Sequence, residues 1–142
     1  MTDKDVLVRK LTSLTEQVGR LRRRRGEDLA VFRADVDLQD AIGMSLLVAV
    51  QDALDIALHV ASDEGWGVPP SYAESFELLE RHAVIDGSLA QQLVRMATLR
   101  NRLAHGYATV DAERIWSELP AGIVALQAFA STIARWVDRT PT

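Results

Sequence analysis

The stretch LQDAIGMSLLVAVQDALDIALHVA, residues 38–61, decides the fold. Its apolar residues recur at steps of three and four, which predicts an α-helix. They form two stripes on different sides of that helix, namely Leu38, Ile42, Leu46, Ala49, Ala53, Ile56 and Val60, and Leu47, Val50, Leu54, Leu58 and Ala61. A helix that is apolar on two sides packs between neighbours, so this segment is expected to be the central element of the protein.

The segments on either side of this stretch also have a helical period. An apolar seam runs from Leu7 to Leu21, and Asp28 is placed to cap the central helix, which is expected to continue to about Ala61. Glycines and prolines between residues 62 and 70 predict a loop. Ser71 then opens a short helix, because it begins a capping box with the Glu three residues later.

Four signals place the ends of the last two helices. Ser88 with Gln91 offers a second capping box, and Gly106 is expected to end the helix that begins there. A last helical stretch starts near Asp111, and Pro120 is expected to break or kink it because proline has no N–H to donate. No stretch alternates with the period of a strand. The sequence therefore predicts an all-α, up-and-down bundle of about five helices.

Composition restricts the classes of function. The 142 residues are expected to form a single domain, 1–142, with one core. There is no cysteine, which excludes disulfides and thiolate chemistry, and the three histidines lack the spacing of a zinc site. The N-terminus is polar and the longest apolar run is short, so we expect no signal peptide, no membrane association and a cytoplasmic location.

The charge distribution contains one basic run within a chain of net charge −4. The run contains Arg20, Arg22, Arg23, Arg24 and Arg25. Such a cluster can grip a nucleic-acid backbone or an acidic partner. It is also typical of a solvated helix end, where cations suit the C-terminal dipole and Gly26 stops the helix.

The residues most able to do chemistry lie between 100 and 107, in the segment RNRLAHGY. Arg100 continues the apolar stripe of its helix, which contains Leu89, Leu93, Met96 and Leu103. Its guanidinium is therefore expected on a buried face, where an unpaired charge is costly. An internal carboxylate, a carboxylate across an interface and a phosphate ligand are the three candidate partners.

His105 follows Arg100 by five residues, a rotation of about 140° on an ideal helix. The two side chains converge only if the helix ends between them, and Gly106 makes such an ending expected. Asn101, four residues before His105, can hydrogen-bond the imidazole, while Tyr107 lies just past the turn. An Arg and a His at a helix end can bind a phosphate and move a proton, although an ordinary polar helix end has the same composition.

Polar residues on the central helix are candidates for the same site. Asp55 and His59 are four residues apart, and Asp52 adds a carboxylate on the same side. One of the carboxylates could neutralise Arg100 or shape a cleft, and a polar stripe facing solvent fits equally well. His82 is expected at the surface.

The order Arg-x4-His-x-Tyr, with Asn directly after Arg, resembles the signature of the HEPN superfamily and, more narrowly, of the HepT toxins. Residues 51–60, the Pro69-x-Ser71-Tyr72 segment and Leu89–Tyr107 are also similar to that family. The resemblance implies an all-α homodimer whose motif residues line a cleft at the interface. It also implies RNA cleavage without a metal ion.

Carried over to this chain, the resemblance implies that Arg100 and His105 are catalytic and that Asn101 supports them. It implies that Tyr107 is the residue to which an MntA-like nucleotidyltransferase antitoxin attaches AMP. The function predicted is therefore an endoribonuclease toxin acting on transfer or messenger RNA, without metal or other cofactor, that leaves 2′,3′-cyclic phosphates. The alternative is a non-catalytic HEPN accessory module that binds nucleotide or a nucleotidyltransferase.

Overall fold

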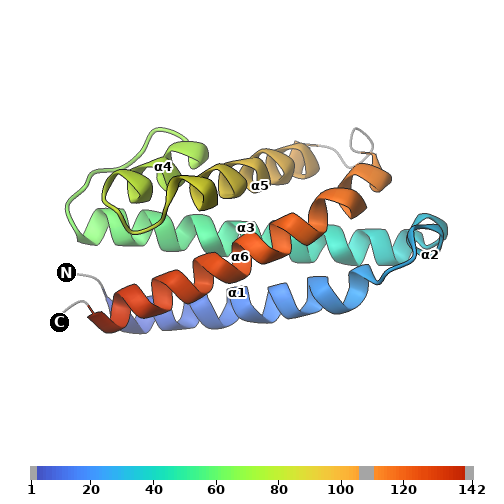
Figure 1. The fold of residues 1–142 in the computed structure, drawn as a ribbon, viewed down its shortest axis with the longest axis horizontal. Coiled ribbons are helices and arrows are strands. Elements are labelled where there is room, and N and C mark those ends of the chain that lie inside the picture. The colour runs from blue at the N-terminus through green and yellow to red at the C-terminus, as the bar shows by residue number, and fades with distance from the viewer. Residues whose placement is uncertain (1–2, 106–110, 140–142) are drawn as a thin grey trace.

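The computed structural model describes residues 3–105 and 111–139, and of Tyr72 and His105 it describes only the backbone. The described residues form six α-helices and no strand: α1 (Lys4–Arg25), α2 (Leu29–Ala34), α3 (Val36–Asp63), α4 (Tyr72–Arg81), α5 (Gly87–His105) and α6 (Ala112–Arg139). Figure 1 shows α1, α3 and α6 lying along one another, with α4 and α5 on the other side of α3 from α1. The expected all-α bundle is confirmed.

The helix α3 is the central element, because it contacts each of the five other helices described. Of its two apolar stripes, the buried members are Ile42, Leu46, Ala49, Ala53, Ile56, Val60, Val50, Leu54 and Ala61. By length and composition α3 is apolar enough to cross a membrane, but 61% of its most apolar window is buried inside the protein. Burial of this kind is what the middle helix of a bundle requires, and it explains the apolar composition.

The helix expected from Asp28 to about Ala61 is in fact two helices, which is a correction to the sequence-based boundary. Asp35 interrupts it with an extended backbone, φ −119° and ψ 96°, and its carboxylate accepts the N–H of Leu38 at 3.0 Å. The side chain of Gln39 donates to the carbonyl oxygen of Phe32 at 2.9 Å. The break is stable because the polar groups exposed at both helix ends find partners there.

The two predicted capping boxes have different outcomes. Ser71 caps α4 as expected, since its hydroxyl oxygen accepts the N–H of Glu74 at 3.3 Å. The cap of α5 was placed wrongly, because Asp86 and not Ser88 accepts the N–H of Leu89, at 2.8 Å. Asp and Ser are similarly good caps, so pattern alone does not choose between two candidates two residues apart.

Pro120 does not break α6, which runs through it without interruption. Proline leaves the carbonyl oxygen of Trp116, four residues earlier, without its usual helical donor. The guanidinium Nε of Arg25 donates to this oxygen at 3.0 Å, and the indole N–H of Trp116 donates to the carbonyl of Arg25 at 3.3 Å. The guanidinium also lies 3.7 Å from the centre of the Trp116 ring. The end of α1 thus compensates for the proline in α6.

We expect Arg25→Ala to lower the free energy of unfolding by about 1–3 kcal/mol, because it removes a charge-assisted hydrogen bond and a cation–π contact. Urea denaturation measures the loss, with Arg22→Ala, an exposed member of the same run, as the control expected within about 0.5 kcal/mol of wild type. In a Pro120→Ala background the loss should shrink, since alanine supplies the missing N–H. Equal losses in both backgrounds would contradict this account.

Candidate functional site

Arg100 lies on α5 with its side chain half-buried against α3. Its Nη2 donates to Oε1 of Gln51 at 2.8 Å, and its Nη1 donates to Oδ1 of Asn101 at 3.2 Å. Both of these acceptors are neutral amide oxygens. The guanidinium is therefore oriented at two of its nitrogens by contacts that add no negative charge.

Gln51 connects Arg100 to Asp55, which lies on α3 like Gln51 itself, and through Asp55 to Lys10 on α1. Its Nε2 donates to Oδ1 of Asp55 at 2.8 Å, and the other oxygen of Asp55 lies 3.2 Å from Nζ of Lys10 on α1. A continuous row of hydrogen bonds thus joins α1, α3 and α5. Asp55 is linked to Arg100 through the amide of Gln51, and the hypothesis that one of the α3 carboxylates neutralises Arg100 stays a prediction.

The side chain of Asp52 contacts α1. Its carboxylate is buried, with 6% of the residue exposed, and accepts a short hydrogen bond from the hydroxyl of Ser13. Burial raises the pKa of Asp52 above its ordinary value, and the nearby charge of Asp55 acts in the same direction. The Ser13 hydrogen bond and the charge of Lys10 oppose this rise in pKa without cancelling it.

His59 does not join the candidate site. Its Nε2 lies 3.1 Å from a carboxylate oxygen of Asp63, the residue four positions later on α3. His82 is exposed, as expected, and its ring stacks on Trp66 with 4.0 Å between centroids. Among the residues described, no group of three His, Cys, Asp or Glu is placed to hold a metal ion.

The other motif residues are only partly described. His105 is the last residue of α5 that the structure describes, so the helix end expected at Gly106 stays a prediction. Its side chain, and Gly106 and Tyr107 entirely, lie outside the described residues. The amide oxygen of Asn101 accepts a hydrogen bond from Arg100. The expected hydrogen bond between Asn101 and His105 stays a prediction, because the side chain of His105 is not described.

The arginine run at the end of α1 is divided among different tasks. Arg25 holds Trp116, and Arg24 donates to the buried hydroxyl of Ser45 at 3.2 Å. Arg20, Arg22, Arg23 and Arg24 are all exposed residues. The run is therefore partly a structural anchor, and four of its five members are open to solvent.

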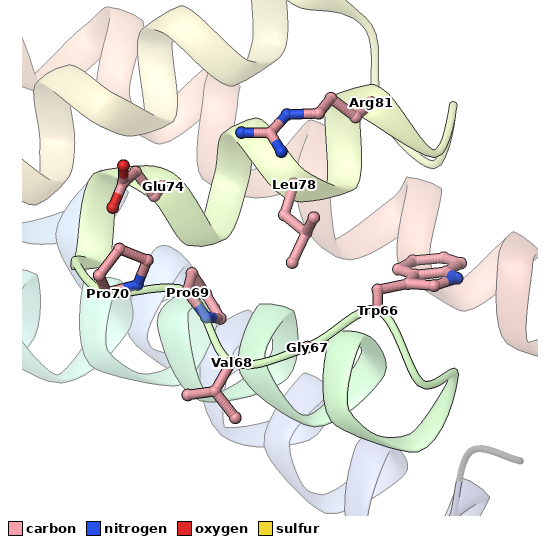
Figure 2. A pocket seen from close by; sticks show the side chains of 8 residues that line it. All are labelled: Trp66, Gly67, Val68, Pro69, Pro70, Glu74, Leu78 and Arg81. Atoms are coloured by element: carbon pink, nitrogen blue, oxygen red, sulfur yellow. The ribbon is translucent and has the colours of Figure 1, made fainter.

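A shallow hollow of about 190 Å³ lies beyond the C-terminal end of α3, and neither Arg100 nor Gln51 lines it. Figure 2 shows it between the Trp66–Pro70 loop and α4, with Leu78 pointing toward the loop and Arg81 at its upper rim. This hollow is therefore separate from the part of the candidate site that contains Arg100 and Gln51.

Comparison with known proteins relates the motif helix to a family. Residues 14–133 match a family model described as ribonuclease HepT-like. The mRNA nuclease HepT of Shewanella oneidensis is 30% identical over 103 residues, which is 72% of this chain and 77% of that protein. This chain belongs to the HepT-like ribonuclease family. A putative RNase of Archaeoglobus fulgidus is 35% identical over 75 residues, covering 53% of this chain and 56% of that protein.

Solved structures extend the HepT-like assignment to nearly the whole fold. A tri-AMPylated HEPN toxin of Shewanella oneidensis, in complex with its MNT antitoxin, superposes with a TM-score of 0.85 at 25% identity, over 95% of this chain and 99% of that chain. A toxin–antitoxin structure with AMP-PNP gives a TM-score of 0.86 at 24% identity, over 92% and 98% of the two chains. The HepT-like resemblance of the RNxLAHGY segment is therefore confirmed at the level of family and fold.

Sequence reasoning missed two members of this row of hydrogen bonds, Gln51 and Lys10. Gln51 stands four residues before Asp55, a spacing that places an amide beside a carboxylate on a helix. That signal could have found the pair. The contacts of Gln51 with Arg100 and of Asp55 with Lys10 join residues 49 and 45 positions apart, which spacing along one helix cannot predict.

The raised pKa of Asp52 makes a prediction about stability and pH. The folded state holds this proton to a higher pH than the unfolded state, whose pKa is near 3.8, so the free energy of unfolding falls as pH rises between the two pKa values. Asp52→Asn should remove that fall and be more stable than wild type at neutral pH. Urea denaturation from pH 3.5 to 7 measures the difference between the two proteins.

Ser13→Ala provides the opposite arm of the same experiment. It removes the hydrogen bond that favours the ionised carboxylate, so stability should fall more steeply with pH than in wild type. A difference between Asp52→Asn and wild type that stays constant with pH would contradict the assignment.

Proposed function

We propose that this chain is an endoribonuclease toxin that cleaves RNA without a metal ion, with Arg100 and His105 as its catalytic residues. Family membership supports ribonuclease activity, and the relative with 30% identity is named an mRNA nuclease. The observation that carries the proposal is the position of Arg100. Its guanidinium is half-buried and held by Gln51, five residues before His105 on the same helix.

The chemistry needs little more than these two groups. RNA supplies its own nucleophile, because the 2′-oxygen attacks the adjacent phosphorus while the 5′-oxygen leaves. The products are a 2′,3′-cyclic phosphate and a 5′-hydroxyl end. Arg100 holds the phosphoryl oxygens as negative charge develops, and an imidazole that titrates near neutral pH transfers a proton. Asn101 supports Arg100 through its amide oxygen.

The proposal includes a homodimer and an RNA substrate, either transfer or messenger RNA. When attack and departure are simultaneous, one imidazole cannot accept the 2′-hydroxyl proton and protonate the leaving 5′-oxygen at the same time. A two-fold interface that pairs the motif helices would bring two Arg100 and two His105 side chains to one cleft, so that one His accepts a proton while the other donates. The proposed location is the cytoplasm, where RNA is available.

Silencing by a nucleotidyltransferase antitoxin completes the proposal. A HEPN toxin that superposes on this chain carries AMP groups and is bound to an MNT antitoxin. We place the modification in this chain on Tyr107, whose phenolic oxygen would attack the α-phosphorus of ATP and release pyrophosphate. The attached phosphate adds negative charge close to the motif, where it competes with RNA for Arg100.

The first test replaces the two catalytic residues. We expect Arg100→Ala to lower the single-turnover cleavage rate about 10²–10³-fold, because the phosphate loses its charged donor. His105→Ala should lower it about 10²–10⁴-fold, because the proton transfer is lost. Cleavage of transfer RNA and of a transcribed messenger RNA is followed by gel, with 2′,3′-cyclic ends detected chemically.

Arg102→Ala is the matched control, since Arg102 is an exposed arginine on the same helix. It should cleave within about twofold of wild type, and wild-type cleavage should persist in EDTA. Expression of the wild-type protein should stop growth, and expression of Arg100→Ala or His105→Ala should not. If neither RNA is cut by wild-type protein that binds nucleotide or the transferase, the non-catalytic accessory module is the function.

A separate prediction concerns the antitoxin. We expect Tyr107→Phe to keep RNA cleavage within about threefold of wild type, because a phenol of pKa about 10 is a poor base at neutral pH. The variant should no longer be silenced when incubated with a nucleotidyltransferase antitoxin and ATP. Radiolabelled ATP followed by peptide mapping locates the adenylate. A label on another residue, with silencing intact in the variant, would refute the assignment.

A further inference from the structure

The amide of Gln51, in the middle of the row of hydrogen bonds, donates on one side and accepts on the other. Asp55 bonds the Nε2 side of the Gln51 amide, and Arg100 bonds the Oε1 side. An ionised carboxylate only accepts hydrogen bonds and a guanidinium only donates them. The amide therefore has a single orientation that satisfies both neighbours, and Lys10 holds Asp55 in place from α1.

We propose that Gln51, with Asp55 behind it, is a positioning residue that sets the orientation of the Arg100 guanidinium for phosphate binding. The inference rests on the proposed nuclease function and adds a role that the motif itself does not contain. The guanidinium is planar, with donors in a fixed fork, so an acceptor at Nη2 determines where its remaining donors point. Gln51 supplies that acceptor at 2.8 Å.

The side chain of Gln51 carries no charge, and this also matters for Arg100. A carboxylate at this position would also accept from Nη2, but it would add a full negative charge beside the cation that must bind phosphate. The amide orients the guanidinium and keeps the carboxylate of Asp55 one side chain further away. A negative charge brought to position 51 should therefore reduce activity more than simple removal of the hydrogen bond.

Gln51 contributes to geometry more than to stability. The Lys10–Asp55 pair behind it is partly exposed, 41% and 33% for the two side chains. Ion pairs of this exposure contribute about 0–1 kcal/mol to folding. Substitutions in this row should therefore leave a folded protein, so that their effect on catalysis can be measured separately.

The test compares Gln51→Leu, Gln51→Glu and Asp55→Asn with wild type, using kcat and KM for transfer RNA and for a transcribed messenger RNA. We expect Gln51→Leu to lower kcat about tenfold with a smaller change in KM, because the cation remains but loses its fixed direction. The kcat of Gln51→Glu should be at least tenfold lower than that of Gln51→Leu. Asp55→Asn should also lower kcat, because an asparagine can donate as well as accept and no longer fixes the orientation of the Gln51 amide. Its loss of kcat should be smaller than in the other two variants, because Gln51 itself is still present.

A double-mutant cycle with Arg100→Ala separates positioning from a general structural role. If Gln51 acts through Arg100, Gln51→Leu causes no further loss of kcat in the Arg100→Ala background. Gln127→Leu, on α6, is the control for loss of an amide and should match wild type. Thermal unfolding followed by circular dichroism confirms that each variant is folded.

The outcomes distinguish this inference from the proposed function. A large loss in Arg100→Ala with wild-type kcat in Gln51→Leu, or losses that add in the double variant, would overturn the positioning role alone. If Gln51→Leu does not fold, equal kcat values in Gln51→Glu and wild type would still overturn it. Undiminished cleavage by Arg100→Ala would instead overturn the proposed function.

Discussion

A helix that is apolar over most of its circumference must be covered by other helices, and α3 meets this requirement with five neighbours. The order of the remaining elements follows from this need. Helix α1 covers one side, α4 and α5 cover another, and α6 closes the bundle against α1 and α5. Three polar residues of α3, Gln51, Asp52 and Asp55, make contacts between neighbouring helices.

Two carboxylates one helical turn apart consequently have different surroundings. Asp52 is enclosed between α3 and α1, where loss of water raises its pKa. Asp55 stays partly exposed and joins a lysine to an amide. Both carboxylates contact α1, so their different burial, and not the neighbouring helix, separates a carboxylate that costs stability from one that orders the side chain beside it. The two acceptors described for Arg100, on Gln51 and Asn101, are both amide oxygens.

Sequence reasoning succeeded where one helix carries the information. The two stripes of α3 and the Ser71 cap are periodic or local signals, and both were predictable. The half-buried place of Arg100 followed from its position in an apolar stripe. Its partner did not, because the register of α5 against α3 depends on how side chains interlock across the bundle. The break at Asp35 was missed because the helical period continues across it, although Asp35 caps α3 with its own carboxylate and Gln39 bonds the end of α2.

The row from Lys10 to Arg100 also has a consequence for the order in which the site is assembled. Its members come from the first, third and fifth helices, so no continuous fragment shorter than about two thirds of the chain contains them all. During synthesis the lysine and both α3 side chains emerge long before the arginine they help to orient. The guanidinium acquires its direction only after α5 has docked, so a ribosome-bound chain lacks an ordered site until most of its bundle exists.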